Sequence, residues 1–576
     1  MKSTIRTAIS IVIFAAAFYP ADYLHAQTDT TFFVDSSYEE DGKTQEKARF
    51  LLGSSQTYIY VEDEYFRALA SEQQDLFTIR AQKIAQEFDQ ITYPRLRAVF
   101  GREWNTGIDN DARVTIYFTR MKARAEGYIR KNDEYGKSFF DDSNEREMLY
   151  VSATSVLNSS QAGAILAHEF QHLITLNQKT KLQGVQEERW LDEAKSEYAV
   201  TAAGFNDAWE GSRLQESVRL LRLNPNDALL VWEDEPIDYA TASLFLHYLV
   251  GQYGEVFLKQ LNSSRYVGAE AITQALASLG KTRTFSDVFE DWTVALLINR
   301  DIDGTGRYAY SQPMLQYNNL HIQPPVTHTI SSQTPAVGSN SAFQDFQPQW
   351  YRFIPSLLEG KKVEVLEISL RTHIDNDYVR VPVITTLLTG ETRISYSETR
   401  EGKMTVRVSD FMDDVSSVVI IPASHTEIRG REKLGVYRIL AISVNLTDVQ
   451  PPAVSPRVIR DGDLIRAKGT TKVYVVNGFY RRWIQSPQIM AMYGHLRWEN
   501  IVEVTEEELQ RYKESFLIQK AGDFRIYEVT LAGSGTKQWL NMTPQRFEAS
   551  GRAWSAVFTV NAREFVWYKT GNILRI

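Results

Sequence analysis

The stretch 161–178 reads QAGAILAHEFQHLITLNQ and combines a helical hydrophobic pattern with two histidines. Its apolar residues recur at helical spacing, small alanines lie between them, and no proline interrupts the run, so the pattern predicts an amphipathic helix. His168 and His172 are four positions apart and therefore share one face of that helix. With Glu169 beside the first histidine, the stretch brings two metal-ligating rings and a carboxylate to one point.

Two neutral imidazole nitrogens can hold a zinc ion, and Glu169 is placed to accept a proton from a water at that ion. This combination is typical of metallopeptidases. The alternative is that both histidines lie on a helix surface and pair with acids.

A catalytic zinc takes three protein ligands and keeps a fourth position for water, so one more ligand is required. Positions 175 and 178 hold Thr175 and Gln178, which excludes the longer motif with glycine and a third histidine there. The next helical stretch, 187–200 (EERWLDEAKSEYAV), carries Glu193 and Glu197 one turn apart. We expect Glu193 to be the third ligand and Glu197 to accept a hydrogen bond from a ligating histidine.

The two histidines followed by 190–194 (WLDEA) resemble the gluzincin arrangement shared by thermolysin and the zinc aminopeptidases. Residues 31–300 also resemble a group of secreted bacterial metallopeptidases related to hyicolysin and often called immune-inhibitor-A-like. The shared segments are 104–111 (WNTGIDND), Gly127-Tyr128 and 143–148 (SNEREM). The resemblance implies an α+β, thermolysin-like zinc peptidase domain. Ala194 and Lys195 depart from this group, which more often has glycine and a small or apolar residue; they bear on substrate fit and remove no ligand.

The run 147–153 (EMLYVSA) is rich in β-forming residues and precedes the zinc helix. The resemblance implies that it is an edge strand on which an extended peptide is laid antiparallel, with Met148, Leu149 and Tyr150 as substrate-binding residues. From the residues alone, the same run is equally a core strand, because edge and internal strands look alike in sequence.

Gluzincins stabilise the oxyanion with a tyrosine or histidine farther along the chain. Tyr239, at the start of a predicted helix, is the first candidate, and His247, two turns later, is the second. A lone histidine on an apolar helix is more often a core residue.

These residues predict a zinc-dependent endopeptidase in which Glu169 is the general base and zinc-activated water is the nucleophile. The alternative is a catalytically inactive surface- or polymer-binding protein built on a peptidase-like scaffold. An aminopeptidase is a narrower option, whose Gly-x-Met-Glu-Asn motif is not apparent.

The first 26 residues predict a signal peptide. Lys2 and Arg6 precede an apolar run over 8–18, and 24–26 (LHA) is a cleavage site that ends in a small residue. The alternative, an uncleaved anchor, is disfavoured because about eleven apolar residues are too few to span a bilayer. No later segment has eighteen apolar residues in succession, so we expect a mature chain without a transmembrane helix, secreted or held at the cell envelope.

The chain has 576 residues, of which 43% are hydrophobic, and a net charge of −9. This composition supports several globular cores and argues against nucleic acid as a main partner. With no cysteine, the chain has no disulfides and no cysteine-based metal site. Six acids are candidate calcium ligands in loops near the site: Asp109, Asp111, Asp133, Glu134, Asp141 and Asp142. No calcium-hand spacing is present, which favours a solvated acidic surface instead.

The domain organisation predicted from the pattern has four parts after the signal peptide. A catalytic domain over 27–300 contains further helices near 212–223, 239–261, 269–279 and 285–298. A loop-rich linker over 301–345 leads to a β-sandwich over 346–450.

Residues 458–576 contain two aromatic-rich repeats of about 55 residues, in which Tyr474, Trp483 and Trp498 recur as Tyr527, Trp539 and Trp554. Their aromatics are candidates for stacking on a cell-surface polymer, although repeated tryptophans more often build a core.

Overall fold

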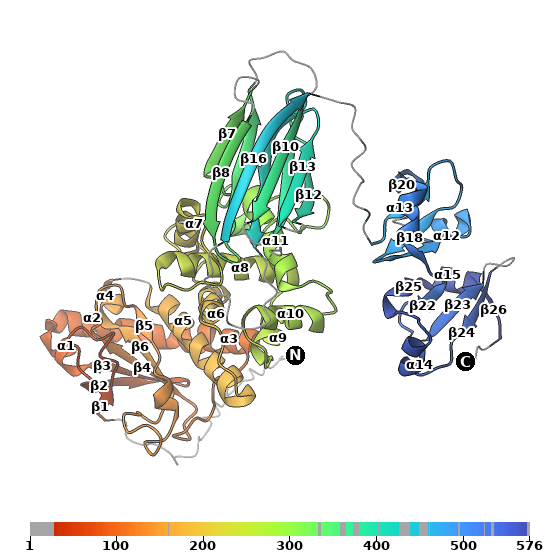
Figure 1. The fold of residues 1–576 in the computed structure, drawn as a ribbon. Helices are drawn as coiled ribbons and strands as arrows, with labels where there is room; N and C mark the ends of the chain where they lie inside the picture. Colours follow the sequence, from red (N-terminus) through yellow and green to blue (C-terminus); the bar gives the residue numbers. More distant parts are fainter. Residues whose placement is uncertain are drawn as a thin grey trace, which may run out of the picture. The chain divides into compact units, whose positions relative to one another are not determined.

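A computed structural model describes residues 28–576 except 159–160, 332–335, 357–363, 373–378, 400–401, 425–437, 449–458, 460, 494–495, 524, 531–534 and 573–576. The predicted signal peptide lies outside the described residues. The chain divides into a first unit, 1–448, and a second unit, 449–576. Among the helices that are described, none combines the length and the apolar character needed to cross a membrane. The fold is α+β, and Figure 1 shows its helices and strands.

The first unit begins with a six-stranded sheet whose strand order is β1-β2-β3-β4-β6-β5. The strands are β1 (Thr30–Phe33), β2 (Gln45–Gly53), β3 (Thr57–Glu62), β4 (Val114–Thr119), β5 (Gly127–Tyr128) and β6 (Met148–Ser152). Strands β3, β4 and β6 run parallel, and all three are buried on both faces. Their near-continuous apolar sequences follow from this, because such a strand has no solvated face to carry polar residues.

Helices cover one face of this sheet and aromatic side chains fill the other. Helices α2 (Ser71–Glu87) and α5 (Ala162–Thr175) contact the sheet, and α3 (Tyr93–Phe100) packs against α5. On the opposite face, Tyr128 stacks on Tyr150 with ring centroids 4.4 Å apart. Strand residues alternate between the two faces, as the period of two requires: Ile59 and Val61 belong to the helical side, and Tyr58 and Tyr60 to the aromatic side.

The edge-strand prediction for 147–153 is wrong. Strand β6 lies between β4 and β5, so the edge is the two-residue strand β5, which pairs antiparallel with β6. Met148, Leu149 and Tyr150 are all fully buried, and the Tyr150 hydroxyl donates to Asp133 inside the fold. These three side chains therefore belong to the interior of the sheet.

Six further helices follow: α6 (Arg189–Ala202), α7 (Arg213–Leu223), α8 (Pro236–Tyr253), α9 (Val256–Ser263), α10 (Gly268–Ser278) and α11 (Phe285–Ile298). Short helices α1 (Asp63–Ala68) and α4 (Ala153–Asn158) flank the sheet strands. The predicted helix near 239–261 is divided into α8 and α9 at Gly254, whose φ of +75° ends α8. Glycine adopts this conformation without the Cβ clash that other residues meet, so it is a common helix terminator.

The predicted linker over 301–345 is also wrong. Tyr308, Tyr310, Leu315 and Leu320 are buried in the same core as the helices. Farther on, 326–343 already contains β7 (Val326–Ile330) and β8 (Ala336–Phe343). Loop-forming residues set the backbone conformation here, but they do not prevent the segment's aromatic and leucine side chains from joining a core.

Two sheets with a common hydrophobic core form the rest of the first unit. One has the order β13-β10-β16-β8 and the other β12-β11-β14-β9-β7, with β15 paired to β11. The remaining strands are β9 (Tyr351–Pro355), β10 (Glu364–Thr372), β11 (Val379–Leu387), β12 (Thr392–Glu398), β13 (Lys403–Val408), β14 (Val415–Ile420), β15 (Ala423–Ser424) and β16 (Arg438–Asp448). Ile384 and Val419 of the second sheet join the helical core, so this sandwich packs against the helices.

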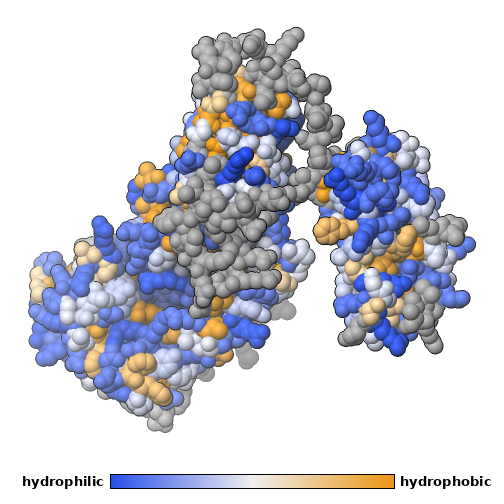
Figure 2. All heavy atoms as spheres, in the orientation of Figure 1, coloured by the Kyte–Doolittle hydropathy of each residue, from blue (hydrophilic) through white to orange (hydrophobic). Residues whose placement is uncertain are grey.

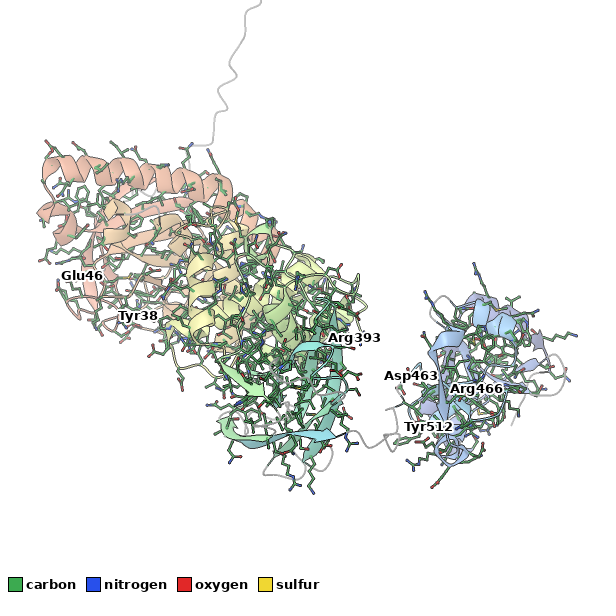
Figure 3. The ribbon with its side chains drawn as sticks, turned by 90° about the horizontal axis from the view of Figure 1, so that it is seen from above. Tyr38, Glu46, Arg393, Asp463, Arg466 and Tyr512 are labelled. Carbon is green, nitrogen blue, oxygen red and sulfur yellow. The ribbon has the colours of Figure 1, made fainter. Side chains whose placement is uncertain are left out.

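The second unit consists of two modules with equivalent strand orders, β20-β17-β18-β19-β21 and β25-β22-β23-β24-β26. In the first module these are β17 (Leu464–Ala467), β18 (Tyr474–Asn477), β19 (Tyr480–Trp483), β20 (Ile501–Val504) and β21 (Lys513–Glu514). In the second they are β22 (Leu517–Lys520), β23 (Ile526–Thr530), β24 (Thr536–Trp539), β25 (Val557–Val560) and β26 (Lys569–Thr570). Asp463, Arg466 and Tyr512 lie in the first module (Figure 3).

The repeated aromatics of this unit have two different environments. Tyr474 and Tyr527 are buried, as expected for core residues. Trp498 and Trp554 occupy the same place in their modules, at the start of a short turn before β20 and β25, and are 54% and 48% exposed. The core interpretation is therefore wrong for this pair.

Buried carboxyl groups in the first unit make its stability depend on pH. Glu147 is almost fully buried near Glu134 and Asp109, and burial raises its pKa from an ordinary 4.5 to about 8, helped by both acids. A raised folded-state pKa favours the protonated form. The contribution of the Glu147 carboxyl group to folding stability is fully present below about pH 4.5, and it is lost as the pH rises through about 8.

We therefore expect Glu147→Gln to unfold at a higher temperature than the parent at pH 8–9, by roughly 2 °C or more, with the difference vanishing toward pH 5. Thermal unfolding across pH 5–9 measures this. Glu216→Gln is the control, because Glu216 is exposed and its lowered pKa leaves it charged over this range. A constant difference between Glu147→Gln and the parent at every pH would contradict the expectation.

Candidate metal centre

Packing of α5 against α6 brings His168, His172 and Glu193 together. Glu193 Oε2 lies 3.2 Å from His168 Nε2 and 3.5 Å from His172 Nε2, and the two Nε2 atoms are 3.3 Å apart. Ligand atoms about 2.0–2.1 Å from a tetrahedral zinc lie about 3.3 Å from one another. The three side chains therefore fit a metal ion of that size.

The outer nitrogen of each histidine faces a carboxylate. His168 Nδ1 lies 3.1 Å from Glu197 Oε1, and His172 Nδ1 lies 3.2 Å from Asp192 Oδ2. A proton held on Nδ1 by a carboxylate leaves Nε2 free to ligate a metal. Glu197 thus lies beside one of the two histidines, as predicted. Asp192 was not predicted to contact His172; the one hint in the sequence is that it directly precedes Glu193.

The carboxylates make this point attractive to cations. Burial by itself raises the pKa of Glu193, but the two histidines that face it bring the pKa well below its ordinary value. Burial likewise lowers the pKa of His168, yet hydrogen bonds with Glu193 and Glu197 raise it to about 9. Protons and a metal ion compete for the same nitrogen atoms, so metal affinity rises with pH.

Glu169 lies beside the ligands and against the edge strand. It is 6% exposed, and burial raises its pKa above the ordinary value. A Cβ on Gly127 would lie only 2.8 Å from Glu169 Oε1 and 2.8 Å from Ile165 Cγ2. Strand β5 can approach α5 this closely because residue 127 has no side chain.

Gly127→Ala is therefore expected to displace the Glu169 carboxylate while leaving the metal ligands in place. If the centre is catalytic, we expect its reaction rate to fall by about 10- to 100-fold with metal content unchanged, since small misplacements of a reacting group have effects of this size. Steady-state kinetics and metal analysis measure both quantities. Gly136→Ala is the control, because its Cβ would meet no atom closer than 3.5 Å. Equal activity in both variants would rule out the contact with Glu169 as a constraint.

His168, His172 and Glu193 line a cavity of about 1020 Å³. Tyr38, Gly127, Arg189, Arg213 and Tyr239 contribute to its walls. The segment 35–40 reaches the cavity because it lies along 120–122, and Tyr38, labelled in Figure 3, stacks on Tyr128 of β5. In the face of the molecule that Figure 2 shows, hydrophilic residues predominate and hydrophobic ones form separate patches.

The two candidate oxyanion donors lie in different places. Tyr239 lines the cavity, its hydroxyl donates to Asp234 Oδ1 at 3.0 Å, and burial raises its pKa, so it remains a proton donor at neutral pH. His247 is fully buried between Thr201 and the carbonyl of Ser243, and does not line the cavity. It is a core histidine with satisfied hydrogen bonds.

Arg213 and Tyr38 also line the cavity, although no motif in the sequence predicts that they do. Arg213 is the first residue of α7, directly after the N-cap Ser212. Its guanidinium forms an ion pair with Glu126, and its Nη1 lies 3.3 Å from Glu197 Oε1. It thereby fixes the carboxylate that holds His168. An arginine at a capped helix start is a common surface pattern, so only its contacts distinguish it.

Five of the six acids considered as calcium ligands have protein partners. Arg130 pairs with Asp133 and Asp142, and Lys181 pairs with Glu134. Asp109 and Asp111 accept backbone N–H groups of their own turn. Within the described part of the chain, the one group of three metal-ligating side chains is that of His168, His172 and Glu193.

Comparison with known proteins finds a relative among the metalloproteases. The chain is 25% identical over 267 residues to the neutral metalloprotease ShpI of Staphylococcus hyicus, an alignment that covers 42% of this chain and 56% of ShpI. The chain thus spans about half the length of that relative.

No protein-family model matches the chain. Solved structures aligned to it include the Yersinia pseudotuberculosis-derived mitogen, at 9% identity and a TM-score of 0.15, covering 21% of this chain and 92% of that one. The pre-peptidase C-terminal domain of Bacillus anthracis collagenase aligns at 7% identity and a TM-score of 0.14, covering 21% of this chain and 98% of that one. What the comparisons show is similarity between part of this chain and a metalloprotease.

Proposed function

We propose that this chain is an exported zinc endopeptidase of the gluzincin type, with a thermolysin-like catalytic domain. The observation that carries the proposal is the spacing of three ligand atoms, 3.2 to 3.5 Å apart, beside a buried glutamate in a large cavity. Similarity to a metalloprotease supports the same reaction class. Export rests on the signal peptide predicted over 1–26.

His168, His172 and Glu193 would hold the zinc ion, which when bound supplies a Lewis acid that polarises the scissile carbonyl and acidifies water. Glu169 accepts a proton from the attacking water and later donates it to the leaving amine. Burial raises the pKa of Glu169 above its ordinary value, the direction that makes a carboxylate a better proton acceptor. Glu197 and Asp192 hold the two imidazole rings in orientation.

Strand β5 is the proposed binding edge for the substrate. It is the last strand of the sheet, it lies against Glu169, and Gly127 lines the cavity. An extended peptide paired with such an edge would satisfy backbone hydrogen bonds and pass across the metal ligands. This arrangement favours internal peptide bonds, in agreement with the absence of an aminopeptidase motif.

Tyr239 is the proposed oxyanion donor. Tyr239→Phe removes only its hydroxyl, and we expect kcat to fall by about 100-fold with little change in KM, because the hydrogen bond matters most when negative charge develops on the carbonyl oxygen. Steady-state kinetics on a peptide substrate measure this. An unchanged kcat would exclude Tyr239 and make Arg189, which lines the same cavity, the next candidate donor.

Metal removal and replacement test the proposed function. The purified chain is expected to bind one zinc ion, to digest casein, to lose activity with a chelator and to regain it with zinc. Digestion that persists without metal would refute the mechanism. A folded chain that binds no zinc would favour the alternative of an inactive binding protein.

The exposed tryptophans of the second unit favour a separate binding role. Residues 449–576 carry 18 Lys and Arg against 12 Asp and Glu, a net charge of +6 in a chain whose total is −9. Two equally placed indole rings on a basic unit suit an anionic polysaccharide with repeated sugar rings. Retardation of the chain in an alginate gel is expected to be lost in Trp498→Ala/Trp554→Ala, and retardation that survives would exclude these rings.

A further inference from the structure

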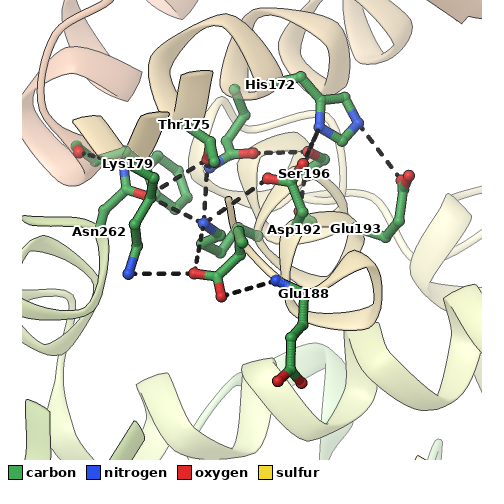
Figure 4. A network of polar contacts seen from close by, with 12 residues as sticks. His172, Thr175, Lys179, Glu188, Asp192, Glu193, Ser196 and Asn262 are labelled. Carbon is green, nitrogen blue, oxygen red and sulfur yellow. Dashed lines mark hydrogen bonds and ion pairs between the residues drawn. The ribbon is translucent and has the colours of Figure 1, made fainter. Parts of the chain in front are cut away.

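A network of buried polar side chains adjoins His172 and Glu193 (Figure 4). Lys195 follows Glu193 by two positions, so the two side chains point about 200° apart around the helix. Lys195 and Lys179 are both fully buried, as is Asn262 of α9. Removing an ammonium group from water costs several kcal/mol unless charged and polar partners compensate. The partners of Lys195 therefore indicate why it is there.

Lys195 has three close acceptors and one more distant carboxylate. Its Nζ lies 3.1 Å from Thr175 Oγ1, 3.1 Å from Asn262 Oδ1 and 3.4 Å from Glu187 Oε2. Lys179 Nζ lies 3.3 Å from the same Glu187 oxygen. Two ammonium groups thus share one carboxylate. The second negative charge that balances them is Asp192, whose Oδ1 lies 3.8 Å from Lys195 Nζ.

Asp192 is also the carboxylate that faces His172. Its Oδ2 lies 3.2 Å from His172 Nδ1, so its two oxygens are divided between a lysine and a metal ligand. Ser196 Oγ is equally near His172 Nδ1, at 3.2 Å, while its hydroxyl donates to Gln171 Oε1 at 2.7 Å. Of these two acceptors the charged carboxylate forms the stronger hydrogen bond, provided that its orientation is held.

We propose that Lys195 is a positioning residue for the metal centre, which holds Asp192 in the orientation that keeps His172 Nε2 directed at the metal. The inference rests on the proposed function, because it assigns His172 as a ligand. Lys195 acts through Asp192 and touches neither metal nor substrate.

Lys195→Met keeps the length of the side chain and removes its charge. We expect zinc to dissociate about tenfold faster than from the parent, as for loss of other groups that orient metal ligands. Transfer of zinc from the full-length protein to a colorimetric chelator measures the rate, and the absorption bands of the cobalt-substituted protein should shift. Lys179→Met is the matched control, because Lys179 shares Glu187 but otherwise contacts the carbonyls of Ser264 and Tyr266. Its zinc dissociation is expected within about twofold of the parent.

A double variant separates positioning from general loss of stability. If Lys195 acts through Asp192, then Lys195→Met in an Asp192→Asn background should accelerate zinc release no further than Asp192→Asn alone. Equal acceleration by Lys195→Met and Lys179→Met, or full additivity with Asp192→Asn, would overturn the proposal. Lys195→Gln, which keeps amide donors for Thr175 and Asn262, serves if the methionine variant does not fold. A parent that binds no zinc would refute the proposed function itself, which is a distinct outcome.

Discussion

Glu169→Gln should lower the rate of peptide hydrolysis by about 10³-fold while zinc stays bound. The amide has the shape of the carboxylate but cannot accept a proton, and Glu169 is not among the three atoms that fit a metal ion. Since the side chain is buried beside the ligands and closely approached by Gly127, the substitution should leave the cavity intact. Kinetics on casein and on a short peptide, with zinc measured in the same samples, test this.

Glu216→Gln is the control for the loss of a carboxylate at this cavity. Glu216 also lines the cavity, but it is exposed and pairs with Arg219 on the surface of α7. Its substitution should change the rate by less than about twofold, because exposed ion pairs contribute little. If Glu169→Gln retains most of the activity, another group is the general base. If it loses zinc, the carboxylate takes part in the metal site.

Glu193→Gln should abolish stoichiometric zinc binding and with it all measurable hydrolysis. A neutral amide replaces the one anionic ligand, and we expect zinc affinity to fall by about 10³-fold or more. Competition with a chelator of known affinity measures the change. Thermal unfolding of the metal-free protein verifies that the variant is folded.

Glu197→Gln is the matched comparison, since Glu197 is one turn away on the same helix and similarly buried, at 6% exposed against 8% for Glu193. It contacts His168 Nδ1, on the far side of the ring from the ligand atom, so its loss should weaken zinc binding by about 10- to 100-fold. The order of the two effects is the test. If zinc affinity falls further in Glu197→Gln than in Glu193→Gln, then Glu197 is the metal ligand and Glu193 the residue that orients a histidine.

Local spacing accounts for what could be predicted about the candidate site. Residues four apart on a helix share a face whatever the helix packs against, so His168, His172 and their neighbour Glu169 follow from the pattern in 161–178. Glu193 and Glu197 follow from the same rule on the next helix. The helices themselves were predicted well where apolar periodicity was strong, as for α7 and α11.

Predictions failed where the answer depended on which segments become neighbours. The sequence of strand β6 is compatible with a core strand and with an edge strand. It is internal because Gly127 and Tyr128 pair with it as β5, and two residues are too few to show the period of a strand in the sequence. The predicted linker has loop-forming residues, yet its aromatics reach a core formed by distant helices. Trp498 and Trp554 show that a repeated position need not be a buried one.

The sequence by itself therefore determined which reactive side chains lie together on each helix: two histidines and a glutamate on one, two further glutamates on the next, with no cysteine anywhere in the chain. Only the tertiary structure decided how those groups are held. It assigned Asp192 to His172, placed Lys195 and Lys179 on one shared carboxylate, and made β5 the edge beside Glu169. The reason is that helical periodicity fixes neighbours within one turn, whereas contacts between helices and strands depend on packing of the whole core.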